Sequence, residues 1–98
     1  MAPTEEFPSE IRELLKAGAL RRVSDTEFAI DALQHRVRTW MGWNTVSYEL
    51  RIEEGDEGQP LYEIAEQTEE LGEQIVLSSA DVDDATFWVT DQIQEKER

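Results

Sequence analysis

The stretch from Glu53 to Glu73 most strongly limits how this chain can fold. Nine of its 21 residues are Asp or Glu, and none is Lys or Arg. The same stretch contains Leu61, Tyr62, Ile64 and Leu71, which need an apolar environment. Any fold must therefore bury one side of the segment while a block of unneutralised carboxylates stays in water.

The negative charge is concentrated in one half of the chain. The 98 residues have a formal net charge of −14 at pH 7. Residues 1–42 contain seven acids and six bases, whereas residues 43–98 contain 16 acids and three bases. This asymmetry favours a charged interaction surface over a uniformly solvated one. It disfavours direct binding to nucleic acid or to an anionic membrane, because both are polyanions.

Length and composition indicate one small domain over residues 1–98, with polar ends at 1–6 and 95–98 that are expected to fray. Three Trp, three Phe and two Tyr supply large core anchors despite a hydrophobic fraction of only 39%. The absence of cysteine excludes disulfides, zinc–thiolate sites and thiol nucleophiles. No signal peptide and no apolar run of about 18 residues is visible, so a cytoplasmic location is expected.

Two helices are expected in the first half of the chain. Residues 8–17 place Ile11, Leu14 and Leu15 on one face, and Gly18 follows as a stop. The segment from Ser24 to Met41 begins with the pattern Ser-Asp-Thr-Glu, which fits a capping box. Its apolar stripe comprises Ile30, Leu33, Val37, Trp40 and Met41.

The second half contains two expected strands and a final helix. From Thr45 to Glu53, apolar and polar residues alternate with the period of a half-buried strand. A second strand is expected from Glu73 to Ser78. A last helix is expected from Asp81 to Gln94, with acidic residues in its first turn. Its core-facing residues are Val82, Ala85, Trp88, Val89 and Ile93.

The segment from Pro60 to Leu71 fits two structures. As a helix, it would connect its flanking strands in a right-handed parallel crossover. Alternatively, a strand from Leu61 to Glu66 would pair back on the segment from Thr45 to Glu53 and form a hairpin. Together these elements predict an α+β fold in which three or four helices pack against a sheet of two or three strands in a single compact domain.

No pattern in the sequence supports catalysis. The single histidine, His35, is expected on the surface of the second helix, and no nucleophile accompanies it. The glycines match no phosphate-binding loop, and the acidic clusters match no EF-hand. The chain is therefore predicted to be a non-enzyme without metal or cofactor.

The aromatic residues have two interpretations. Trp40 and Trp43 flank Gly42, where core anchoring is favoured over a binding platform. Phe87 and Trp88 are adjacent on the last helix, so one of them is expected at an edge or an interface.

The acidic stretch is the main candidate site. On a helix, Glu63, Glu66 and Glu70 would form a ladder with a spacing of about 5–6 Å, resembling the regular charges of a nucleic-acid backbone. The chain is therefore predicted to bind a basic protein surface, as an inhibitor or nucleic-acid mimic directed at a nucleic-acid-binding enzyme. The predicted binding residues are Glu53, Glu54, Asp56, Glu57, Glu63, Glu66, Glu69, Glu70 and Glu73.

Two further hypotheses remain. Arg21, Arg22, Arg36 and Arg38 form a secondary basic patch, which is either a solvated surface or a homo-oligomer contact to the acidic half of a second copy. The acidity as a whole has an alternative explanation, a salt-adapted (halophilic-type) cytoplasmic domain with a structural or regulatory role.

Overall fold

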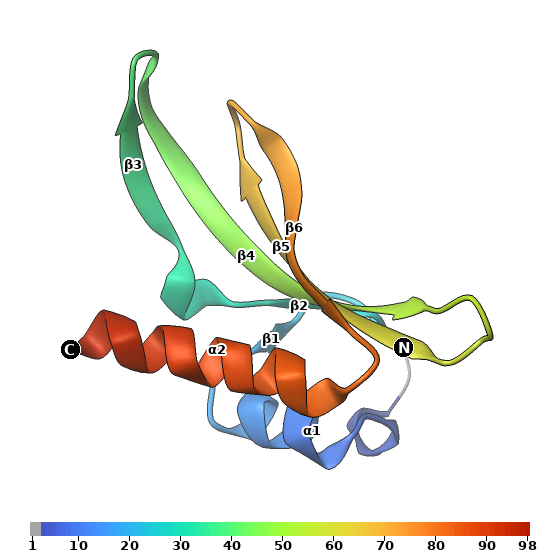
Figure 1. Ribbon diagram of the computed structural model, residues 1–98. Helices are drawn as coiled ribbons and strands as arrows, with labels where there is room; N and C mark the ends of the chain where they lie inside the picture. The colour runs from blue at the N-terminus through green and yellow to red at the C-terminus, as the bar shows by residue number, and fades with distance from the viewer. Residues whose placement is uncertain (1–2) are drawn as a thin grey trace.

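A computed structural model describes residues 3–98, in which two α-helices accompany a six-stranded antiparallel sheet (Figure 1). A short 3-10 helix and the first α-helix precede two short strands, and a second 3-10 helix leads to the long strands and the final helix. The elements are η1 (Thr4–Glu6), α1 (Ser9–Lys16), β1 (Arg21–Arg22), β2 (Glu27–Ala29), η2 (Asp31–Leu33), β3 (His35–Thr39), β4 (Gly42–Glu54), β5 (Pro60–Thr68), β6 (Gly72–Ser79) and α2 (Val82–Glu97).

The long strand β4 organises the sheet. The strand order is β1-β2-β4-β5-β6, and β3 also pairs with β4. One continuous row of partners crosses four strands: Phe28 lies opposite Leu50, Leu50 opposite Ile64, and Ile64 opposite Leu77. Since side chains alternate along a strand, this row defines one apolar face of the sheet.

Both helices cover that apolar face (Figure 1). Ile11 of α1 and Ala85 and Val89 of α2 are fully buried in the same core as the sheet residues. The ring of Phe7 meets the ring of Phe28 edge to face, with centroids 5.1 Å apart. The opposite face of the sheet carries Glu49, Arg51 and the other odd-numbered residues of β4, and is called the open face below.

The predicted fold class is wrong in its counts. The structure has two α-helices and six strands, where three or four helices and two or three strands were expected. The main error is the segment from Ser24 to Met41, which forms β2, η2 and β3. Its apolar residues fit a helical stripe, but Phe28, which lies outside that stripe, is fully buried, whereas Trp40 and Met41 of the stripe are exposed.

The capping-box pattern at Ser24 has a different structural role. The Ser24 hydroxyl does donate to the Glu27 carboxylate, over 3.3 Å. The contact lies in the turn between β1 and β2, where the Glu27 carbonyl accepts from the amides of Val23 and Ser24. The same side-chain pair therefore closes a β-turn here, because hydroxyl and carboxylate groups bond to local backbone in turns as well as in caps.

Pro60–Thr68 forms strand β5 and residues 69–71 form the turn to β6, so the hairpin alternative is confirmed and the parallel crossover is absent from the described residues. β5 pairs antiparallel with β4 from Glu54–Pro60 to Val46–Thr68. β5 lies between β4 and β6, and it buries Tyr62, Ile64 and Ala65. Ala65 lies opposite Glu49, so β5 contributes a buried residue on the open face as well as Ile64 in the core.

The remaining elements are confirmed. The helix expected over residues 8–17 is α1, and it ends at Gly18 with φ +81°. The amides of Gly18 and Ala19 donate to the carbonyls of Leu15 and Leu14, which is a Schellman motif. The expected strands lie within β4 and β6, and the last helix is α2, capped by the Asp81 carboxylate.

The chain ends were expected to fray. Residues 1 and 2 lie outside the described residues, Thr4–Glu6 forms η1, and α2 continues through Glu97.

Candidate functional site

The acidic residues predicted to bind are distributed along the whole length of β5. Glu63 lies on the open face, opposite Arg51. Glu66 lies on the other face and accepts a 2.6 Å hydrogen bond from the Tyr48 hydroxyl. The ladder expected for Glu63, Glu66 and Glu70 does not form, because β5 is a strand and successive side chains point to opposite faces.

Two acidic groups mark the ends of β5. Glu53, Glu54, Asp56 and Glu57 lie at the end of β4 and in the loop that leads to β5. Glu69 and Glu70 lie in the turn between β5 and β6. β5 is nine residues long, so a rise of about 3.3 Å per residue separates the two groups by roughly 30 Å.

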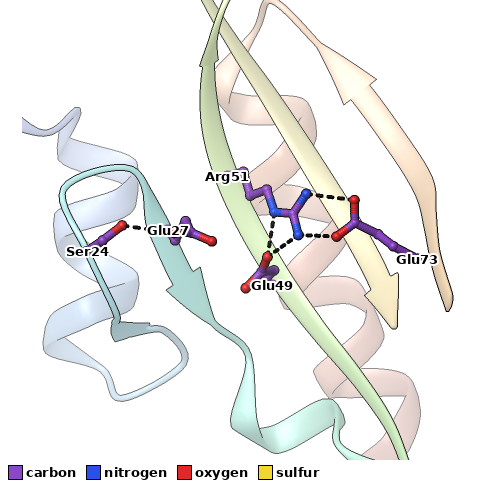
Figure 2. Close-up of polar contacts among 5 residues, drawn as sticks. All are labelled: Ser24, Glu27, Glu49, Arg51 and Glu73. Carbon is purple, nitrogen blue, oxygen red and sulfur yellow. Dashed lines mark hydrogen bonds and ion pairs between the residues drawn. The ribbon is translucent and has the colours of Figure 1, made fainter. Parts of the chain in front are cut away.

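Glu73 belongs to an ion network on the open face (Figure 2). The guanidinium of Arg51 lies between the carboxylates of Glu49 and Glu73 and donates to both. The side chains of Arg51 and Glu49 are only 19% and 24% exposed. The hydrogen bond from Arg51 lowers the pKa of Glu73, and the same bond raises the pKa of Arg51.

The other predicted acids lie outside this ion network. Among residues 3–98, Glu73 is the one member of the nine that takes part in an ion pair. Glu66 and Glu70 accept hydrogen bonds from neutral groups, Tyr48 and Asn44. The acidic stretch therefore remains a source of uncompensated negative potential along β5.

The second surface is apolar and was not predicted from the sequence. Its members are Trp40, Met41, Trp43 and Leu71, which are called the hairpin end. Trp40 is 88% exposed, Met41 66% and Leu71 69%. The β3–β4 and β5–β6 hairpins project away from the helices at the same end of the sheet (Figure 1). The prediction that Trp40 and Trp43 anchor the core is wrong, because they lie on a projecting hairpin.

Hydrogen bonds fix the geometry of the hairpin end. Trp40 and Met41 are the two residues between the paired Thr39 and Gly42, and Gly42 has φ +108°. The Thr39 hydroxyl donates to the Gly42 carbonyl and accepts from the Met41 amide. Only a residue without a side chain adopts the Gly42 conformation easily, so this glycine helps to define the turn.

Asn44 connects the two hairpins. Its side chain is buried, and its amide nitrogen lies 3.1 Å from the Thr39 hydroxyl and 3.3 Å from the Glu70 carboxylate. Glu70 belongs to the β5–β6 turn, so this contact links the tip of the β3–β4 hairpin to the tip of the β5–β6 hairpin. The sequence signal was Gly42, because a short hairpin loop is commonly completed by a glycine in the left-handed region.

The predicted basic patch divides into two parts. Arg21 forms an ion pair with Asp31, and Arg22 forms one with Asp25, both at 2.7 Å. Arg36 and Arg38 lie on β3 instead, with their guanidinium carbons 5.5 and 5.9 Å from the centre of the Trp43 ring. The first pair is thus neutralised within the chain, and the second stacks beside the hairpin end.

His35 is exposed, as expected, but it lies at the start of β3 and not on a helix. Its Nδ1 atom donates to the Leu33 carbonyl over 2.9 Å. Within residues 3–98, no group of three or more His, Asp or Glu side chains is arranged to hold a metal ion.

Tyr48 gives the site a measurable pH dependence. Burial, and secondarily the Glu66 carboxylate, raise the pKa of Tyr48 to about 12. In the unfolded chain the phenol has a pKa of about 10 and loses its proton above that pH, whereas the folded state still holds the proton there. We expect the free energy of unfolding to fall as pH rises from about 10 to about 12, and to fall less in Tyr48→Phe.

Urea unfolding of both proteins across this pH range measures the difference. An ultraviolet titration in which both tyrosines ionise at their ordinary pKa would contradict this expectation.

The two helices described here are too short and too polar to cross a bilayer. Comparison of the chain with protein-family models, with curated proteins and with solved structures finds no match. The geometry of the hairpin end and of the carboxylates along β5 is therefore the basis for assigning a function.

Proposed function

We propose that this chain is a non-enzymatic protein that binds and inhibits a basic cytoplasmic partner. The hairpin end supplies the short-range contacts, and the carboxylates along β5 attract the partner from a distance. The observation that carries the proposal is the exposure of Trp40, Met41 and Leu71 on two hairpins that Asn44 links to each other.

The hairpin end has the composition of a binding hot spot. Large apolar side chains are costly to leave in water, and a tryptophan that is 88% exposed contributes nothing to its own core. Tryptophan is enriched at the centres of protein interfaces, where charged residues surround it. Arg36, Arg38, Glu69 and Glu70 occupy that surrounding position.

The charge selects a basic partner. The net charge of −14 and the unpaired carboxylates along β5 repel polyanions and attract a positive surface. A nucleic-acid-binding enzyme is the most natural target, because its substrate groove is basic. Since the ladder of Glu63, Glu66 and Glu70 is absent, the proposal rests on attraction by charge and not on a phosphate-like spacing.

Binding kinetics test the short-range contacts of the hairpin end and the long-range attraction by the carboxylates separately. The immobilised protein captures a partner from lysate, and surface plasmon resonance then measures the purified pair. We expect Trp40→Ala to accelerate dissociation by about tenfold or more. Reversal of Glu54, Asp56 and Glu57 to lysine is expected to slow association and to reduce its dependence on salt.

Reversal of Glu5, Glu6 and Glu13 to lysine is the matched control. It makes the same change in net charge in the half of the chain that lies near neutrality, so its effect on association should be smaller. Unchanged dissociation in Trp40→Ala, or a captured partner that is acidic, would refute the proposal.

Salt-adapted folding makes a different prediction. Under that alternative, molar KCl would raise the melting temperature steeply, and the protein would be poorly folded in dilute buffer. Under our proposal, the protein is folded in dilute buffer and the charge reversals change binding without changing the fold.

A further inference from the structure

A cavity of about 350 Å³ lies between the C-terminal half of α2 and the sheet, away from the hairpin end. Three aromatic rings line it: His35 at the start of β3, Tyr48 in β4 and Trp88 in α2. The ring centroids of His35 and Tyr48 are 6.2 Å apart, and those of Tyr48 and Trp88 are 5.8 Å apart. Buried Leu33 contributes to the wall, which is more apolar than polar.

The size of the cavity limits its ligand. Pockets for small molecules span about 300–1,000 Å³, so this cavity lies at the lower end and suits a compact group. Its wall exposes few polar atoms that could replace the water around a strongly hydrated ligand. A group with little need for hydrogen bonds is therefore favoured.

The electrostatics of the wall favour a cation. The faces of aromatic rings carry negative potential and attract positive charge within about 6 Å of the ring centre. The Tyr48 hydroxyl donates to the Glu66 carboxylate, which increases the electron density of the phenol ring. The Glu95 carboxylate lies on the rim, and the net charge of the protein adds to the same field.

Two basic groups lie near the rim, Lys96, which lines the cavity, and Arg98, and their positive charges oppose a ligand cation. The Lys96 ammonium donates to the Ala32 carbonyl. Arg98 forms an ion pair with Glu95 at 2.8 Å, and both of these side chains are more than half exposed. An exposed pair of this kind contributes little, so a ligand cation can compete for the Glu95 carboxylate.

We propose that the cavity lined by His35, Tyr48 and Trp88 binds an organic cation, specifically a quaternary ammonium group. Such a group has no N–H donor, is weakly hydrated for a cation and suits a partly open pocket lined by aromatic rings better than a primary amine does. This site is independent of the basic partner at the hairpin end, and it adds a small-ligand function to the protein.

Choline and its neutral carbon isostere, dimethylbutanol, test the proposal directly. NMR titration follows the indole N–H of Trp88 and the backbone amides of Leu33 and His35, at constant ionic strength. We expect saturable shifts with choline and at least about tenfold weaker binding of the isostere. Equal affinity for the two compounds would mean an apolar cavity only, and absence of saturable binding by either would also overturn the proposal.

Charge variants at the rim give a second, sign-specific test. Glu95→Gln is expected to weaken choline binding, and Lys96→Met is expected to strengthen it, because one removes an attractive charge and the other a repulsive one. Neither change should alter binding of the neutral isostere. Unchanged choline affinity in both variants would contradict a cation site.

Variants of the aromatic residues on α2 distinguish choline binding in the cavity from binding elsewhere on this helix. Trp88→Leu is expected to weaken choline binding by about 2- to 30-fold. Phe87→Leu is the control, since this neighbouring ring is 72% exposed and does not line the cavity. Comparing free choline with an N-acetylated trimethyl-lysine amide then identifies the source of the cation. Tighter binding of choline indicates a free metabolite, and tighter binding of the amide indicates a modified protein side chain.

Discussion

Replacing Phe28 with alanine is expected to lower the free energy of unfolding by about 3–5 kcal/mol. Phe28 is fully buried at the centre of the core, opposite Leu50 in the sheet and edge to face with Phe7. Removing its ring leaves a cavity that the neighbouring strands cannot close, because their pairing fixes their separation. Urea unfolding followed by circular dichroism measures the change.

Trp40→Ala is the matched comparison, and it is expected to change the free energy of unfolding by less than about 0.5 kcal/mol. The two variants distinguish the sheet from a helix over residues 24–41. In the helix, Trp40 would belong to the buried stripe and Phe28 would lie outside it, so the order of the two effects would be reversed. A larger loss of stability in Trp40→Ala would therefore contradict the observed fold.

Replacing Arg51 with methionine is expected to lower the free energy of unfolding by about 2 kcal/mol, between the values for exposed and buried ion pairs. Methionine keeps most of the apolar stem of the side chain but removes its charge. The Glu49 and Glu73 carboxylates, which the guanidinium bridges, then repel each other on the open face. Glu27 and Glu63, which lie opposite Arg51 on the neighbouring strands, add to that repulsion.

Arg21→Met is the control for this experiment. Arg21 forms an ion pair with Asp31, but their side chains are 64% and 56% exposed, so its loss is expected to lower stability much less than the loss of Arg51. If the two substitutions lower the free energy of unfolding equally, the Arg51 network contributes no more to stability than the exposed pair of Arg21 and Asp31.

The Arg51 network also has a defined pH dependence. The pKa of Glu73 is lowered in the folded state by its hydrogen bond from Arg51. Its contribution to stability is therefore present above the ordinary glutamate pKa of about 4.3 and is lost as pH falls through the lower folded value. This part of the acid sensitivity should disappear in Arg51→Met.

Local chemistry was sufficient to predict four elements. α1 ends where Gly18 permits a left-handed residue, and α2 begins where the Asp81 carboxylate accepts from the Asp83 amide. Most of β4 follows from strict alternation, which places Leu50 inside and Arg51 outside. β6 follows from a short apolar run at 75–77. Each signal depends on residues close in sequence, so the prediction does not depend on contacts with distant parts of the chain.

The sequence predicted which carboxylates belong to the candidate site, but it did not predict how they are arranged in space. Sequence identified the charge of the stretch from Glu53 to Glu73, but it did not show which of these carboxylates share a face of the sheet. In the folded sheet, the long side chain of Arg51 in β4 reaches Glu73 in β6, two strands away. No local pattern contains a contact between residues 22 positions apart.

What the sequence by itself determined is the charge, the absence of thiol chemistry, both ends of α1 and the alternation of β4. Only the tertiary structure decided the segments from Ser24 to Met41 and from Pro60 to Leu71. The first segment was predicted as a helix and the second fits both a helix and a strand, and in each case the neighbouring strands favoured the strand by offering backbone partners and a shared apolar face. That selection exposed Trp40 and Leu71 at the hairpin end, and it distributed the acidic residues along β5 instead of stacking them on a helix.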